Sequence, residues 1–234
     1  MAETKVVGTT VETHEAVAKA KDFWAKFSKP IIYVGSAVIL LVGGWIAYKS
    51  LIIAPKEAKA ADAIFPSEQI FDKMTQTGFT KDSINLVLNG GPGFIGALKI
   101  AKEYSGTGVA NTANYIAGAC YLHNGDFANA INHLKEFSSN ATQVQTTAYS
   151  MIADANAELN KNDEALEYYK KAASVNEKDE FMSAMYLFEA AKFADKIGKS
   201  KDAIELFQKL KADYPKSSQA NEVDKYLAKL GVTN

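Results

Sequence analysis

The chain has 234 residues and a formal net charge of −1, from 26 basic and 27 acidic residues. All of the basic residues are lysines, so no guanidinium group is available for bidentate contacts with phosphate or guanine, which argues against a nucleic-acid-binding protein. The single cysteine, Cys120, excludes an intramolecular disulfide. With 47% hydrophobic and 23% charged residues, the composition is that of a globular chain.

Residues 1–30 form a basic leader that precedes a long apolar segment. Its apolar residues recur at helical spacing among four lysines: Val17, Ala20, Phe23, Trp24 and Phe27 alternate with Lys19, Lys21, Lys26 and Lys29. A basic helix with aromatic residues on one face can lie on an anionic leaflet. A merely solvated leader fits the sequence as well, and both interpretations stay open here.

Residues 31–53 carry one charge, Lys49, and are expected to form a transmembrane helix. At about 1.5 Å per residue they extend about 34 Å, enough for a hydrocarbon core of about 30 Å. Pro30 falls in the first turn, Tyr33 lies at one end, and Trp45 and Tyr48 lie toward the other. A cleaved signal peptide is the competing interpretation. A membrane anchor is favoured because the leader and the apolar run are both too long for a signal peptide.

Two further features of this helix give weaker evidence, one on its contacts and one on its orientation. Gly43 and Ala47 lie one turn apart on one face, where another membrane helix could approach closely, although glycine is also common in lipid-facing helices. Four lysines precede the span and three follow it closely, which favours a cytoplasmic N-terminus by a margin of one charge.

From residue 57 the apolar periods are those of helices, and a repeat is visible. Three small residues, Gly118, Ala153 and Ala191, are each followed 12 positions later by an alanine: Ala130, Ala165 and Ala203. Four residues beyond each alanine stands a large side chain, Leu134, Tyr169 or Phe207, and Pro215 ends the third unit. This pattern resembles the tetratricopeptide repeat, in which small residues mark helix crossings and large ones fill the space between hairpins.

The resemblance predicts an all-α fold, with a single N-terminal transmembrane helix followed by a tetratricopeptide-repeat α-solenoid over residues 57–234. The expected parts are clear repeats at about 111–144, 146–179 and 184–217, degenerate helical hairpins over 57–105, and a capping helix over 217–230.

The chemical motifs do not support an enzyme, a cofactor or a metal. The run from Gly91 to Gly96 matches the dinucleotide-binding fingerprint in spacing, but the strands and the acidic residue that the fingerprint needs are missing, so we expect a glycine-rich turn. Cys120, His123 and His133 cannot complete a tetrahedral structural metal site, and Cys120 is expected to be a buried packing residue.

In tetratricopeptide proteins, the inner face of each hairpin's first helix holds peptides or partner helices. The resemblance therefore implies a partner or peptide groove at these positions: Tyr115, Ala119, Leu122, Ser150, Asp154, Met185, Phe188 and Lys192. The family's reader of terminal carboxylates needs several basic residues there, and Lys192 is the one available, so an apolar, adaptable groove is favoured. Alternatively, some of these residues pack between hairpins.

A lysine-flanked leader, one anchor and a tetratricopeptide domain together resemble the YfgM-like family of inner-membrane proteins. The resemblance implies a periplasmic domain and, as partners, Sec translocon subunits and a membrane-anchored periplasmic chaperone, besides membrane lipid. Two functions remain open: an accessory, chaperone-like subunit of the protein-export machinery, and a structural adaptor that scaffolds envelope assembly or division proteins without binding clients. A domain facing the cytoplasm is a variant of the second.

Overall fold

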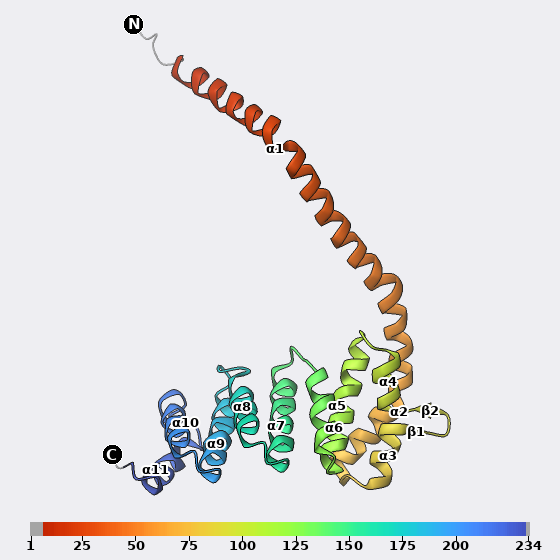
Figure 1. Ribbon diagram of the computed structural model, residues 1–234, viewed down its shortest axis with the longest axis vertical. Coiled ribbons are helices and arrows are strands. Elements are labelled where there is room, and N and C mark those ends of the chain that lie inside the picture. The colour runs from red at the N-terminus through yellow and green to blue at the C-terminus, as the bar shows by residue number, and fades with distance from the viewer. Residues whose placement is uncertain (1–6, 233–234) are drawn as a thin grey trace. The chain divides into compact units, whose positions relative to one another are not determined.

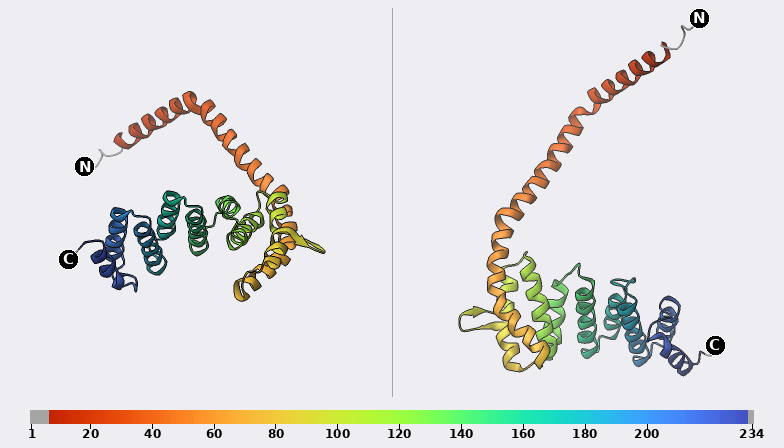
Figure 2. Two further views of the ribbon diagram at one scale, coloured as in Figure 1. Left: turned by 60° about the horizontal axis from the view of Figure 1, so that its bottom comes forward. Right: turned by 180° about the vertical axis from the view of Figure 1, so that it is seen from behind.

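The structure is a computed structural model that describes residues 7–232. The chain divides into two compact units, Met1–Pro55 and Lys56–Asn234, which are described separately. Figure 1 labels the helices and strands, and Figure 2 gives two further views.

The first unit is one long helix, α1 (Val7–Tyr48), followed by a short π-helix, η1 (Lys49–Ile53). The axis of α1 bends within its N-terminal half (Figure 2), and Pro30 lies inside the helix. Among the described residues, one helical stretch, Val17–Thr77, contains a window long and apolar enough to cross a membrane, and none of that window is buried against protein. Residues 31–53 are therefore helical as expected, with a π-turn at their end, and their crossing of a membrane stays a prediction.

The π-turn has an identifiable cause in the sequence. Pro55 has no N–H to donate to the carbonyl of Leu51, and its ring would clash with that carbonyl in a regular α-helix. Widening the helix at Lys49–Ile53 relieves the clash, because hydrogen bonds there reach one residue further. The helical path then continues into α2 (Ala54–Thr77).

The second unit is almost entirely helical. After α2 it contains, in chain order, α3 (Lys81–Asn89), β1 (Gly90–Gly91), β2 (Phe94–Ile95), α4 (Ala97–Glu103), α5 (Gly108–His123), α6 (Phe127–Glu136), α7 (Thr142–Glu158), α8 (Asn162–Ser174), α9 (Glu180–Lys196), α10 (Ser200–Asp213) and α11 (Ala220–Lys229). Figure 1 shows α5 to α10 as a row of antiparallel hairpins, α5 with α6, α7 with α8, and α9 with α10.

The small residues of the repeat lie where the two helices of each hairpin cross. A Cβ atom added to Gly118 would lie 2.5 Å from Cγ of Leu134, so α5 and α6 can approach this closely only because residue 118 is glycine. The corresponding alanines of the other two hairpins, Ala153, Ala165, Ala191 and Ala203, are completely buried. These hairpins confirm the predicted helical-repeat fold.

Three hydrophobic clusters run along the second unit, each centred on residues of neighbouring helices. The first contains Ile64, Met74 and Ile100, the second Leu134 and Ile152, and the third Phe207 and Leu210. Each cluster joins one hairpin to the next, which is how a solenoid stabilises hairpins that are unable to bury both faces alone.

The segment before the repeats differs in detail from the expected hairpins over 57–105. Helix α2 is long, α3 and α4 are short, and a two-stranded antiparallel hairpin, β1 with β2, joins them. The glycine-rich run that imitates the dinucleotide fingerprint forms this hairpin. Gly96 permits it, because a Cβ there would lie 2.3 Å from the carbonyl oxygen of Leu88.

The capping helix is also shorter than the expected 217–230, since α11 begins at Ala220. The residues before it form a turn, in which the Ser217 hydroxyl donates to the Tyr214 carbonyl and accepts a hydrogen bond from the Ala220 amide.

Candidate partner-binding site

The first helices of the three hairpins, α5, α7 and α9, carry the predicted groove residues, and a hydrogen bond connects α9 with α7. The Tyr186 hydroxyl of α9 donates to the Ser150 hydroxyl of α7 at 3.4 Å, and Ser150 in turn donates to the Thr147 carbonyl. The pKa of Tyr115 is raised, mainly by burial and to a smaller extent by the Tyr186 phenol. We call the surface around Tyr115, Ser150 and Tyr186 the inner face.

Further toward the C-terminus, α9 also lines a pocket of about 540 Å³. Its lining comes from α8, α9 and α11 and consists of Tyr169, Glu189, Lys192, Phe193, Asp195, Lys196, Tyr226 and Lys229. We refer to this as the C-terminal pocket. Three aromatic rings and five charged groups line it, a combination suited to binding an apolar side chain flanked by polar groups.

Tyr169 connects the pocket to a predicted groove residue. Its ring centroid lies 5.2 Å from that of Phe193, and its hydroxyl donates a hydrogen bond to the Asp154 carboxylate of α7. Burial, the bond to Asp154 and nearby carboxylates all raise the pKa of Tyr169, so the phenol stays protonated at any physiological pH. Tyr169 is therefore a fixed donor that holds α8 against α7.

Asp154 keeps an exposed surface, yet its carboxylate is crowded by protein. This desolvation raises the pKa of Asp154, the hydrogen bond from Tyr169 opposes the shift, and the carboxylates of Glu189 and Glu158 add to it. The inner face beside the pocket is thus acidic, whereas the pocket itself contains three lysines.

The three lysines of the pocket are not equivalent. Lys192 pairs with Glu189 at 3.1 Å, and Lys229 pairs with Asp195 at 2.7 Å. The sequence analysis named Lys192 but not Lys196, which lies one turn further along the same face of α9, nor Lys229, which belongs to the capping helix. Since two of the three are already paired with carboxylates, the pocket is a weak match for a reader of terminal carboxylates.

The remaining predicted residues fall into two groups. Tyr115, Leu122 and Met185 are half-buried at the inner face or beside it, and Tyr115 also contacts Phe137 with ring centroids 5.0 Å apart. Ala119 and Phe188 are buried, with 4% and 8% of their surface exposed. The prediction that these two line a groove is corrected, because so little of either is accessible to a partner.

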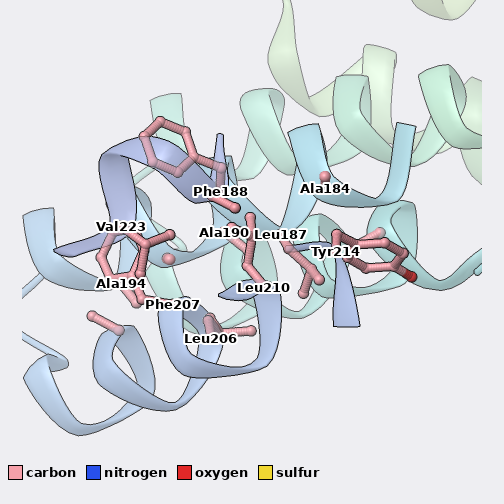
Figure 3. Packing of buried hydrophobic residues seen from close by; sticks show 14 of the residues in the cluster. Ala184, Leu187, Phe188, Ala190, Ala194, Leu206, Phe207, Leu210, Tyr214 and Val223 are labelled. Carbon is pink, nitrogen blue, oxygen red and sulfur yellow. The ribbon is translucent and has the colours of Figure 1, made fainter. Parts of the chain in front are cut away.

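The burial of Phe188 has a clear structural reason. Its ring packs edge-on against Phe207 of α10 and Tyr226 of α11, with centroids 5.8 Å and 5.2 Å apart, inside the C-terminal cluster shown in Figure 3. The capping helix covers the position that would face a groove in the middle of a longer array. Lys192 lies over the outer side of the same ring, with its Nζ atom 5.4 Å from the centroid.

Gly43 and Ala47 lie in the first unit and are exposed, and nothing approaches within 4 Å of the open side of Gly43. The surface is compatible with a neighbouring membrane helix, and the contact itself stays a prediction.

The cysteine and two histidines considered as metal ligands have separate surroundings. Cys120 is completely buried, and burial raises the pKa of its thiol to about 12, so it is unreactive at neutral pH. The His123 ring stacks on Phe79 at 3.6 Å, while His133 bonds Asn114 and stacks on Tyr121. Among the side chains that the structure describes, no group of three candidate ligands is close enough to hold a metal ion.

Comparison with known proteins gives two family matches. Residues 21–183 match the model of a tetratricopeptide repeat-like domain, and residues 185–217 match the model of a tetratricopeptide repeat. No curated protein sequence matches the chain. Domains of this kind mediate protein–protein interactions, so the partners of this chain are proteins. Because the first match covers more than half of the residues of the chain, the chain belongs to the tetratricopeptide repeat-like domain family.

Proposed function

We propose that this protein is a non-enzymatic, membrane-anchored interaction subunit that receives polypeptide segments at the C-terminal pocket and the adjoining inner face. The pocket carries the proposal. It joins half-buried aromatic rings to charged groups of both signs, and it lies beside the first-helix positions that bind partners in tetratricopeptide proteins.

Anchoring through residues 31–53 is part of the proposal. The apolar window is unburied, and the family match begins at residue 21, ahead of residues 31–53. A family model that includes the apolar segment together with the repeats favours a retained anchor over a cleaved signal. With the lysine margin, this supports a cytoplasmic N-terminus and a periplasmic domain in a bacterial inner membrane.

Within this setting, we propose an accessory, chaperone-like role beside the Sec translocon and a membrane-anchored periplasmic chaperone. The resemblance to the YfgM-like family supports these partners, and the mixed apolar and charged lining suits extended segments of many sequences. A structural adaptor for envelope assembly or division proteins is the second candidate, favoured by the paired lysines, which would make a defined surface for one folded partner.

The first experiment is site-specific photo-crosslinking of the full-length protein in its native membrane. A photo-reactive side chain at Lys196, in the pocket, should form adducts, whereas the same group at Lys201, whose side chain is 92% exposed and lies outside the pocket, should form few. Adducts with translocon subunits and exported chains support the chaperone-like role. Adducts with one folded envelope protein support the adaptor, and equal labelling at both positions contradicts a site at the pocket.

A binding measurement then tests the chemistry of the pocket. The double variant Lys192→Glu with Lys196→Glu should change the affinity of the second unit for extended apolar peptides by about fivefold or more, because both charges lie in the pocket lining. Its helicity should stay unchanged, and the aromatic rings of the pocket are retained. Lys161→Glu with Lys201→Glu makes the same charge change at exposed positions outside the pocket and should leave affinity unchanged. Equal effects of the two pairs would show that binding responds to net charge alone.

A further inference from the structure

Residues 17–29 of the leader present an apolar face that is largely exposed. Val17, Phe23, Trp24 and Phe27 are 52%, 56%, 56% and 40% exposed. The Phe23 and Phe27 rings contact each other with centroids 4.9 Å apart, so they form one continuous apolar surface on the helix.

The charges of this segment lie away from that surface. At about 100° per residue, the four apolar residues fall within an arc of about 120°, and all four lysines, Lys19, Lys21, Lys26 and Lys29, lie outside it. The same segment contains one acidic residue, Asp22, so its net charge is positive. An aromatic arc bordered by lysines complements a surface that is apolar below and negatively charged above.

If the membrane helix continued straight through the leader, most of this apolar face would extend beyond the membrane. Trp24 lies seven residues before Ile31, which places it about 10 Å beyond the apolar segment at 1.5 Å per residue. The headgroup region on each side of the hydrocarbon core is only about 5–7 Å thick, so the ring would extend into water. Phe23 and Trp24 are therefore too far out to act as an aromatic belt on an upright helix, whereas Phe27, about 6 Å beyond the apolar segment, would still lie in the headgroup region.

The bend within α1 offers the alternative. Pro30 has no N–H for the carbonyl of Lys26, and its ring clashes with that carbonyl, which favours a kink. A helix that bends at this point can run along the membrane surface, and the anchor keeps it there at high effective concentration, so weak contacts suffice.

We propose that residues 17–29 lie along the anionic leaflet of the membrane that residues 31–53 cross, with Val17, Phe23, Trp24 and Phe27 inserted between the lipids and the lysines at the phosphates. This inference rests on the proposed anchor. It gives the leader a role in holding the helix at a fixed depth and orientation in a membrane containing acidic phospholipid.

The test uses the two tryptophans of the chain as separate reporters in the full-length protein. Trp45→Phe leaves Trp24 to report the leader, and Trp24→Phe leaves Trp45 to report the anchor. Each variant is reconstituted into vesicles whose lipids carry bromine on the acyl chains, with either phosphatidylcholine alone or a mixture containing phosphatidylglycerol. Quenching then measures contact of each ring with the lipid interior, whichever way the protein is inserted.

Trp24 should be quenched at least twice as strongly in the phosphatidylglycerol vesicles, and added salt should reduce the difference. Substituting Lys19, Lys21, Lys26 and Lys29 by Gln should lower Trp24 quenching to the phosphatidylcholine value. The matched control substitutes Lys161, Lys178, Lys201 and Lys216, exposed residues of the second unit, by Gln and should change nothing.

Two results would overturn the inference. Unquenched Trp24 beside strongly quenched Trp45 would place the leader in water, available to a soluble protein, while the anchor stands. Trp24 quenching that is insensitive to lipid charge and to the lysine substitutions would remove the anionic leaflet as the partner. If Trp45 is also unquenched, the anchor fails, and the proposed function fails with it.

Discussion

Gly118 shows how one missing methyl group sets the spacing of two helices. Alanine is favoured over glycine in a helix by about 1 kcal/mol, but a Cβ at this position would meet Cγ of Leu134 at 2.5 Å and the Ala130 carbonyl oxygen at 3.3 Å. The nearest atom is a branch point and has little freedom to move aside. Gly118→Ala should therefore lower the free energy of unfolding by about 1–2 kcal/mol, measured by urea denaturation.

A double-mutant cycle identifies the cause. Leu134→Ala alone should cost about 2–5 kcal/mol, because Leu134 is 2% exposed. Combined with Gly118→Ala, the loss should be smaller than the sum of the two, since the added methyl group then occupies space that the leucine vacated. Additive losses would mean that the two residues do not meet, and the repeat register would be wrong.

The two histidines of the second unit predict a pH dependence. Burial lowers the pKa of both His123 and His133. The Glu136 carboxylate partly opposes the shift in the pKa of His133. The unfolded chain, with ordinary histidine pKa values, therefore takes up protons first as the pH falls below about 6.5. Folding stability should decrease between pH 7.5 and pH 5.5.

The measurement is the free energy of unfolding of a protein beginning at Lys56, which retains no other histidine. His123→Gln with His133→Gln should flatten the profile over this interval, although it also lowers stability at every pH through lost stacking. An unchanged slope in the double variant would assign the pH dependence to other groups.

Single residues also show which contacts the sequence pattern predicts and which it does not. The pattern gives Leu134, Tyr169 and Phe207 the same position in three repeats, and Leu134 and Phe207 are buried as that position requires. Tyr169 is half-buried and donates to Asp154, because its hydroxyl needs a polar partner. Period and size predict which residues pack, whereas Lys229 enters the pocket through the angle of a capping helix that no repeat pattern describes.

At the scale of elements, Glu57 joins the start of α2 to the start of α5. Its carboxylate accepts hydrogen bonds from the amides of Gly108 and Val109 at 2.8 Å and 3.0 Å, while the Thr107 hydroxyl accepts from Ala110. These are the first amides of α5, which have no partner within the helix, and the helix dipole favours a negative charge there. Glu57→Ala should lower the free energy of unfolding by about 1–2 kcal/mol.

The matched control is Glu205→Ala, which removes a carboxylate 4.0 Å from Lys201 on an exposed face and should cost less than about 0.5 kcal/mol. Hydrogen exchange adds a local measurement, since the amides of Gly108 and Val109 should lose protection in Glu57→Ala and keep it in Glu205→Ala. Equal stability of the two variants would mean that the Glu57 contact contributes nothing beyond an exposed ion pair.

The hairpins α5 to α10 could be predicted because each repeats the same small residues at the same spacing. The segment before them could not, since α2, α3 and α4 share neither length nor pattern, and the contact of Glu57 with α5 spans 51 positions. The π-turn at Lys49–Ile53 was likewise unforeseen, although Pro55 is a sufficient signal for a local disturbance of the helix.

At the scale of the whole molecule, the second unit should fold without the first. Its three hydrophobic clusters are built entirely from residues after Lys56, and Glu57 ties α2 to α5 within it. A protein beginning at Lys56 should therefore be soluble, highly helical by circular dichroism and cooperative in urea. Without α1 it should also lose most of its co-purification with a membrane partner, because anchoring raises effective concentration to about millimolar.

Removing Glu57 as well distinguishes a folding effect from an anchoring effect. A protein beginning at Ala58 has the same lack of an anchor, so its partner capture should be equally poor. This protein lacks Lys56 together with Glu57. Its stability should nevertheless be lower by about 1–2 kcal/mol, since the first amides of α5 lose the Glu57 carboxylate and the Ser105 carbonyl loses the Lys56 ammonium group. If the protein beginning at Lys56 is itself unfolded or aggregated, the second unit depends on the membrane segment for its structure, and recognition and anchoring cannot be separate functions of the two units.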